Sequence, residues 1–189
     1  MTRRYSIIAL LACSTASFCG QSVGKPIPPV HGAVLSGEVV DLSASLRGKT
    51  GVLVIGFTEG ARDEVAVWGR KLTADYRESP TVLFYEMPVL ASVPRIIRGL
   101  VLRKIRESIP APAQPHFLPI LDHEAEWKTL AGFDTPGSSN PNAAYVLLVD
   151  PEGLVQWTTR GGATDAAYAE LKRRVEQMRR LSPGSAATP

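Results

Sequence analysis

The sequence predicts a three-layer α/β/α fold in which helices cover both faces of a central mixed sheet. Residues 51–57 form a continuous apolar run, which is typical of a strand buried on both faces. A helical pattern over 62–78 and a second apolar run over 81–87 follow it, and this strand, helix, strand order predicts a right-handed parallel crossover. Near the end, the apolar runs 143–150 and 154–158 are separated by a turn sequence, which predicts an antiparallel hairpin.

The other elements follow from local patterns. Between 62 and 78 the residues Val65, Trp68, Leu72 and Tyr76 recur at spacings of three and four, so they share the helical face that covers the sheet. The remaining predicted elements are a hairpin over 33–42 that turns near Gly37, a helix over 94–108, a short strand over 117–121, a short helix over 124–130 and a final helix capped by Thr164.

The composition fits one globular domain. With 189 residues, of which 44% are hydrophobic and 21% charged, the chain can bury one sizeable core and is too short for two large domains. We expect a signal peptide over 1–21, a Pro-rich linker over 22–32, the domain over 33–181 and a disordered tail over 182–189. The net charge of +3 includes two arginines of the signal peptide, so the balance of the domain gives no reason to expect a nucleic-acid partner.

The first residues predict export. Two arginines precede the apolar run 7–12, which has the layout of a signal peptide and is far shorter than the about 20 residues of a membrane-spanning helix. The sequence Leu-Leu-Ala-Cys that ends at Cys13 resembles the lipobox of bacterial lipoproteins, which implies a lipid anchor on this cysteine and a location on the periplasmic side of a bacterial membrane. Cleavage near Ala16, with Cys19 left as a free thiol, stays open as the alternative.

A wider resemblance covers most of residues 33–178. The motif Leu-Arg-Gly-Lys at 46–49, the strand that ends at Phe57, the helix after it and the sequence 149–153 resemble the plan of exported thioredoxin-like and peroxiredoxin-like proteins. The resemblance implies a thioredoxin-like fold for the predicted sheet and helices.

Other residues fill the position of the redox cysteine. In thioredoxin-like enzymes that cysteine directly follows the first central strand, where a helix N-terminus lowers the pKa of its thiol. Here the position holds Thr58, Glu59, Gly60 and Ala61, and both cysteines of the chain lie before residue 20. We therefore expect a non-catalytic protein with no catalytic residue and no cofactor. A divergent oxidoreductase that depends on Cys19 stays open as an alternative.

A more specific resemblance is to the non-catalytic thioredoxin-like family of mitochondrial ATP-synthase assembly factors and their bacterial relatives. The segments that carry it, in chain order, are 67–70, 86–88, 98–109 and 145–150, followed by Gly153, 156–157, 162–163 and the terminal helix. The resemblance implies a protein partner and a role in the assembly of a membrane complex. Thioredoxins place a cis-proline before the strand that corresponds to 145–150, whereas this chain has Ala143 and Ala144 there; Pro141 is close but out of register, and its cis or trans state stays open.

The histidines give little support for a metal site. The chain has three of them, His31, His116 and His123, and none stands in a spacing typical of metal ligands. We expect ordinary surface histidines and no metal. A small-molecule or metal-binding protein, in which His116, Asp122 and His123 converge at one edge, stays open as a third interpretation of the sequence.

The predicted helix 94–108 is strongly basic. Its charged residues are Arg95, Arg98, Arg103, Lys104, Arg106 and Glu107. Such a helix can lie against anionic headgroups or an acidic partner, or it can pack its apolar stripe on the sheet while its charges face water, and we favour this second arrangement. The candidate residues for a partner or membrane surface are Arg95, Arg98, Arg103 and Arg106, together with Trp157 on the last strand.

Overall fold

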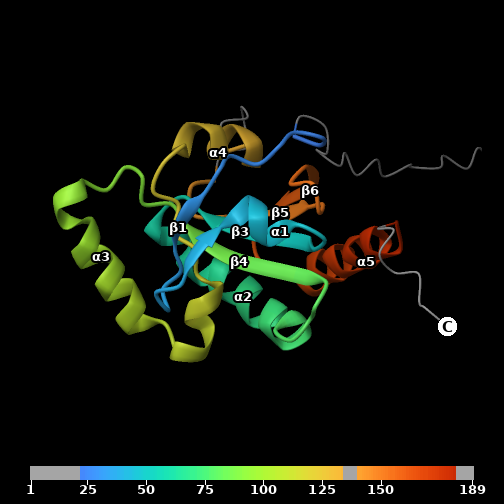
Figure 1. The fold of residues 1–189 in the computed structure, drawn as a ribbon, viewed down its shortest axis with the longest axis horizontal. Helices are drawn as coiled ribbons and strands as arrows, with labels where there is room; N and C mark the ends of the chain where they lie inside the picture. Colours follow the sequence, from blue (N-terminus) through green and yellow to red (C-terminus); the bar gives the residue numbers. More distant parts are fainter. Residues whose placement is uncertain (1–21, 134–139, 182–189) are drawn as a thin grey trace, which may run out of the picture.

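A computed structural model describes residues 22–133 and 140–181, and its centre is a four-stranded sheet (Figure 1). The sheet has the order β4–β3–β5–β6, with β3 at Thr50–Gly56, β4 at Val82–Pro88, β5 at Ala144–Val149 and β6 at Val155–Arg160. β3 and β4 are parallel, whereas β5 is antiparallel to both β3 and β6. The predicted mixed sheet, its parallel crossover and its terminal hairpin are therefore confirmed.

Helices cover both faces of this sheet. Alternate residues of β3 point to opposite sides, so Val52 and Val54 belong to one core and Leu53 and Ile55 to the other. The first core is closed by α2 (Arg62–Tyr76) and α5 (Asp165–Leu181), and the second by α1 (Leu42–Leu46) and α4 (Glu124–Ala131). All seven residues of β3 are buried, as expected for a strand between two helical layers.

The N-terminal part of the domain adds a hairpin of β1 (His31–Ala33) and β2 (Val39–Asp41). Its turn contains Gly37 at a φ of +102°, a backbone conformation that favours glycine.

The segment before this hairpin packs against the domain, which corrects the prediction that residues 22–32 are a linker. The amide of Gly24 donates to the carbonyl of Val155 over 2.7 Å, and the amide of Ile27 donates to that of Gly153 over 3.0 Å. Ile27 and Val30 are buried in the core. Proline-rich composition predicted a spacer, but these two apolar side chains tie the segment to the domain.

The predicted strand over 117–121 is present only as two parallel bridges to the outer side of β4. They pair Phe117 with Glu86 and Ile120 with Val89. The 3₁₀ helix η2 (Ala111–His116) leads into this segment, and a second one, η1 (Glu59–Ala61), precedes α2. The residues that lead into this segment include prolines at positions 110, 112 and 115. Because proline lacks an amide hydrogen for strand pairing, a regular strand does not form before residue 117.

Helix α3 (Arg95–Ser108) has no buried residue, so the expectation that its apolar stripe packs on the sheet is wrong. Figure 1 shows it at the left of the molecule, outside the layers around the sheet. The reason is that α1, α2, α4 and α5 already cover both faces. Within the described residues, 22–133 and 140–181, neither α3 nor any other helix combines the length and hydrophobicity needed to cross a membrane.

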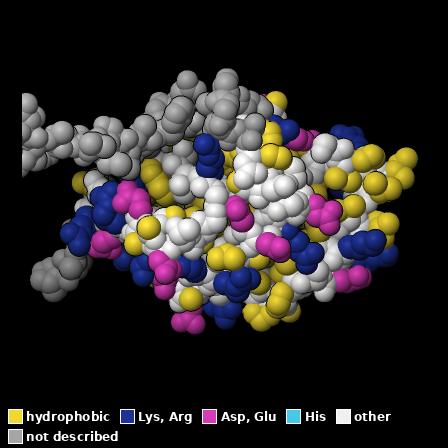
Figure 2. Space-filling view, turned by 180° about the vertical axis from the view of Figure 1, so that it is seen from behind, with side chains coloured by type: hydrophobic (Ala, Val, Ile, Leu, Met, Phe, Trp, Pro, Cys, Tyr) yellow, Lys and Arg dark blue, Asp and Glu magenta, His cyan; other side chains and the backbone are white. Residues whose placement is uncertain are grey.

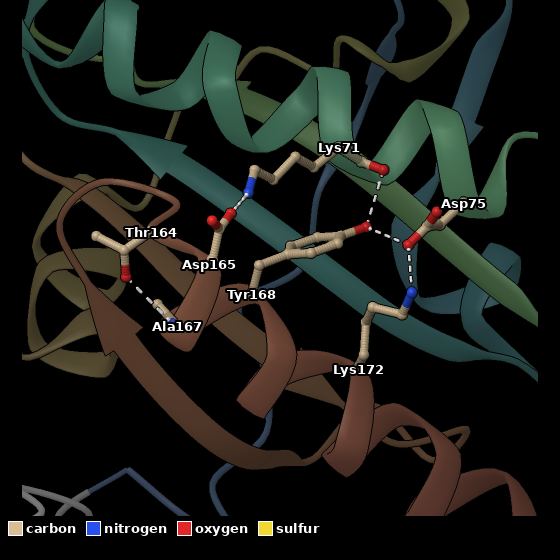
Figure 3. A network of polar contacts seen from close by, with 7 residues as sticks. All are labelled: Lys71, Asp75, Thr164, Asp165, Ala167, Tyr168 and Lys172. Atoms are coloured by element: carbon tan, nitrogen blue, oxygen red, sulfur yellow. Dashed lines mark hydrogen bonds and ion pairs between the residues drawn. The ribbon is translucent and has the colours of Figure 1, made fainter.

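The layer of α2 and α5 is joined by a polar network (Figure 3). The Tyr168 hydroxyl lies 2.8 Å from the carbonyl oxygen of Lys71 and 3.0 Å from the Asp75 carboxylate, and its single hydrogen is shared between these two acceptors. Lys172 binds the same carboxylate over 2.9 Å, and the resulting hydrogen bond holds the pKa of Asp75 below its usual range. The Thr164 hydroxyl accepts from the amide of Ala167, which confirms the predicted cap of α5.

Replacing Tyr168 with phenylalanine is expected to lower the free energy of unfolding by about 1–2 kcal/mol, because Lys71 and Asp75 lose the hydrogen-bond donor of a buried tyrosine. Urea denaturation measures the change. Tyr76→Phe is the matched control, since the Tyr76 hydroxyl has no hydrogen-bond partner within the described ranges. Equal costs for the two variants would contradict the role of the network.

Candidate functional site

The position of the missing redox cysteine is a loop that is closed by hydrogen bonds. Thr58 directly follows β3 and its hydroxyl lies 2.7 Å from the carbonyl oxygen of Pro141 and 3.2 Å from the Oδ1 atom of Asn142. A threonine hydroxyl has a single hydrogen and both neighbours are acceptors. The side chain therefore joins the β3–α2 loop to the turn that precedes β5.

Two further contacts hold the same loop and turn together. A Cβ atom at Gly60 would collide with the side chain of Asn142, so this close approach depends on glycine. The Glu64 carboxylate, in the first turn of α2, accepts a hydrogen bond from the amide of Ala144 over 2.9 Å. The first residue of β5 is thus fixed by a side chain 80 positions earlier.

Aromatic rings pack together next to the loop, around the residue that precedes Thr58. The Phe57 ring lies 4.9 Å from that of Phe133 and 5.3 Å from that of Tyr145, a separation typical of favourable ring pairs. The Tyr145 hydroxyl also donates to the carbonyl of Asn140 over 3.1 Å. The peptide bond before Pro141 is trans. The structure therefore brings Thr58 and Pro141 together, a contact that the sequence analysis did not predict.

The other residues of the loop differ in accessibility. Glu59 and Gly60 are exposed, and Ala61 is buried under the start of α2. Sequence reasoning identified all four positions from Thr58 to Ala61 but missed Asn142 and Glu64. Neither has a local signal, because their partners are distant in the chain.

A buried carboxyl group lies elsewhere, between β4 and α2. Glu86 is 4% exposed, and burial raises the pKa of its carboxyl group from 4.5 to about 8, although the Arg70 charge acts in the opposite direction. A Cβ atom at Gly69 would collide with this carboxyl group. Gly69 and Glu86 thus fit each other across the helix and the strand.

The basic residues predicted on α3 divide into two groups. The Arg98 guanidinium points inward, where its Nη2 atom donates to the carbonyls of Ala91 and Val93 over 3.0 and 3.1 Å. Arg95, Arg103 and Arg106 are exposed. Among the described residues, Arg103 alone of the three has an acidic neighbour, with its Nε atom 3.9 Å from Oε1 of Glu107.

Trp157 does not form an accessible surface together with the exposed arginines of α3. The side chain is 7% exposed, and the Arg174 guanidinium covers its ring at 5.2 Å from the centroid. Its apolar body belongs to the core below α5. The strand position alone did not predict this cover, because it comes from the last helix.

The three histidines lie in different environments. His31 pairs with Asp41 over 2.8 Å, His123 pairs with Glu126 over 2.9 Å, and the His116 ring stacks on Phe84 at 4.1 Å. Burial lowers the pKa of His116. Among the residues that the structure describes, no group of three or more histidine, cysteine, aspartate or glutamate side chains is placed to hold a metal ion.

Comparison with solved structures shows the fold. The chain is similar to the thioredoxin domain of a thiol-disulfide oxidoreductase from Bacteroides vulgatus, with 20% identity, a TM-score of 0.52, and coverage of 81% of this chain and 97% of that chain. It is also similar to the yeast mitochondrial 1-Cys peroxiredoxin, with 14% identity, a TM-score of 0.51, and coverage of 88% and 83%. Both confirm the predicted thioredoxin-like fold.

Comparison of sequences shows the family. No curated protein sequence matches the chain significantly. The family model described as ATP10 protein matches residues 11–178, which includes every element from β1 to most of α5. The resemblance predicted from the short apolar segments is therefore confirmed. The chain belongs to the ATP10 family, the ATP-synthase assembly factors, and carries their thioredoxin-like fold without a cysteine between residues 22 and 189.

Proposed function

We propose that this protein is a non-catalytic thioredoxin-like assembly factor that binds a protein partner during the assembly or folding of a membrane complex. Membership of the assembly-factor family supports a partner. The single observation that carries the non-catalytic part is the Thr58 hydroxyl, which occupies the place of a redox thiol and lies within 3.2 Å of two acceptors.

The surroundings of Thr58 also disfavour the chemistry that a thiol would perform there. A reactive cysteine must lose its proton, and hydrogen-bond donors or positive charges stabilise the resulting thiolate. At this position the near atoms are the Pro141 carbonyl oxygen and the Asn142 Oδ1 atom, both of which repel an anion. The loop therefore suits a binding role better than nucleophilic attack.

The proposed contact surface for the partner is the exposed part of this loop and the turn beside it. Thr58, Glu59 and Gly60 on one side and Pro141 and Asn142 on the other are all exposed. Their mutual hydrogen bonds fix the backbone of both segments before a partner arrives. A preformed surface loses less conformational freedom on binding, which favours association.

We further propose that the protein is exported and held on the periplasmic side of a bacterial membrane by a lipid on Cys13. The support is the signal-peptide layout and the Leu-Leu-Ala-Cys sequence ending at that residue. Cys13 lies outside the described residues. A tether at this end would keep the domain near a membrane-embedded client.

Rescue of a deletion strain tests the proposed function. Loss of the gene is expected to lower the amount of one assembled membrane complex on native gels, with ATP synthase measured first because of the family. The Cys19→Ser protein should restore that complex fully, since no thiol is needed. Cys13→Ser should restore it poorly and move from the membrane to the soluble fraction, because the anchor is lost.

A photo-crosslinking residue at Glu59 then tests the surface. It should capture a subunit of the affected complex, whereas the same residue at Val39, which is 78% exposed on β2 and outside the proposed contact surface, should not. Failure of Cys19→Ser to rescue, with normal protein levels, would favour thiol chemistry. Unchanged levels of all membrane complexes in the deletion strain would refute the assembly role.

A further inference from the structure

Helix α3 exposes an apolar surface that no other element of the described ranges covers. Ile96 is 97% exposed, Ile97 46% and Leu100 45%. Positions three and four apart lie side by side on a helix, so Ile96, Ile97 and Leu100 form one patch. Arg103 and Lys104 follow Leu100 by three and four positions and border the same patch. These five residues are the α3 outer face.

The helix is held in place at its two ends, which fixes the direction of this face. At the start, Arg98 donates to the carbonyls of Ala91 and Val93. At the end, the Nε2 atom of Gln114 donates to the carbonyls of Arg106 and Ile109 over 3.2 and 3.0 Å. The half-buried residues Val101, Leu102 and Ile105 face the body. These contacts hold the α3 outer face toward the solvent.

The positive charge of the chain is concentrated on this helix. It carries five of the 21 basic residues and one of the 18 acidic residues, which leaves 16 basic and 17 acidic residues for the remainder. Arg95, Lys104 and Arg106 have no acidic partner within residues 22–133 and 140–181. On α5, by contrast, four arginines pair with Glu170 and Glu176. These three cations are therefore available for an external anion, and Arg103, which lies 3.9 Å from Glu107 with its side chain 67% exposed, can reach one as well.

We propose that α3 lies flat on an anionic lipid surface. Ile96, Ile97 and Leu100 enter the headgroup region, and Arg103 and Lys104 contact the lipid phosphates. Apolar residues bordered by cations are the composition of helices that bind in the plane of a membrane. Figure 2 shows hydrophobic side chains beside lysine and arginine side chains at the right-hand end of the molecule, where α3 lies. The helix projects outward, which suits a broad surface better than the groove of a protein partner.

This assignment goes beyond the proposed function, because it concerns a lipid and not the client protein. It is also separate from the lipid on Cys13. A lipid on Cys13 would hold the N-terminal end of the chain at the membrane, and the basic and apolar contact of α3 would be a second, independent attachment of the folded domain. The α3 outer face would additionally set the orientation of the domain above the membrane.

Binding of the full-length protein to lipid vesicles tests the assignment. Because residues 7–12 are apolar and can enter any bilayer, the measured quantity is the affinity for vesicles with 30% phosphatidylglycerol relative to pure phosphatidylcholine vesicles. Arg103→Gln with Lys104→Gln is expected to lower this ratio about 30-fold, since each cation near an anionic surface contributes about 1 kcal/mol. Ile96→Ser with Leu100→Ser should lower the affinity for the phosphatidylglycerol-containing vesicles about 10-fold.

The matched control is Arg179→Gln with Arg180→Gln, which removes the same charge from α5 and should leave the ratio within about twofold. A polarity-sensitive fluorophore on Ile96→Cys, in a chain with Cys13→Ser and Cys19→Ser, should shift to the blue on anionic vesicles, whereas one on Val39→Cys should not. An equal loss in the control, or a shift at Ile96 only with membranes that retain their proteins, would overturn the assignment.

Discussion

Trp68→Ala is expected to lower the free energy of unfolding by about 4 kcal/mol, a large share of the total stability of a domain of this size. The indole is fully buried in the core between α2 and the sheet. Its Nε1 atom donates to the carbonyl of Gly161 over 2.9 Å, so the alanine variant loses core volume and leaves a carbonyl unpaired. Thermal unfolding should show a midpoint about 8–16 °C lower.

A pair of phenylalanine variants separates the hydrogen bond from the packing. Trp127 is also fully buried, but its Nε1 atom has no partner in the described part of the chain. Trp68→Phe should therefore cost about 1 kcal/mol more than Trp127→Phe. The comparison remains measurable if Trp68→Ala does not fold. Equal costs would show that the bond to Gly161 contributes nothing.

Glu86→Gln is expected to change how stability depends on pH. The folded protein holds the pKa of Glu86 at about 8, and the unfolded value is 4.5. Between these values the folded state keeps a proton that the unfolded state releases, so the contribution of Glu86 is full below pH 4.5 and falls as pH rises to 8. The fall is about 1.4 kcal/mol per pH unit, or about 4 kcal/mol between pH 5 and 8.

The glutamine variant cannot ionise, so its stability should lack this decline and exceed that of the natural protein most at pH 8. Urea denaturation at a series of pH values measures the difference. Glu170→Gln serves as control, because hydrogen bonding to Arg173 and Arg174 lowers the pKa of Glu170 to about 2. Its contribution to stability is full above pH 4.5 and is lost as pH falls from 4.5 to about 2, outside the range in which Glu86 acts. A parallel decline in the natural protein and Glu86→Gln would reject a buried neutral carboxyl group.

Elements with strong periodicity could be predicted from the sequence. The uninterrupted apolar residues of β3 and the spacing of Val65, Trp68 and Leu72 both reflect contact with the sheet, and the structure confirms both. The same reasoning failed for α3, because a pattern of apolar residues shows that a helix has an apolar side but not whether a neighbour covers it. Here the sheet has no free face left.

The candidate site was predictable only in part. The absence of sulfur after β3 could be seen directly at Thr58. The contacts of this residue with Pro141 and Asn142 could not, since they join segments 83 and 84 positions apart and depend on how β5 meets β3. Likewise, the sequence does not show that the Arg98 side chain turns inward. The basic composition of the helix therefore led us to group Arg98 with its exposed cations.

The way α3 is attached has a consequence for how this protein can change over generations. Its outer residues contribute no buried contact, and both ends are secured by hydrogen bonds to main-chain carbonyls, which any residue supplies. Substitutions at Ile96 or Lys104 can therefore accumulate without a penalty in folding. Lineages that meet different membranes or clients can alter this helix rapidly, whereas a substitution in the sheet or its covering helices carries the cost of disturbed packing.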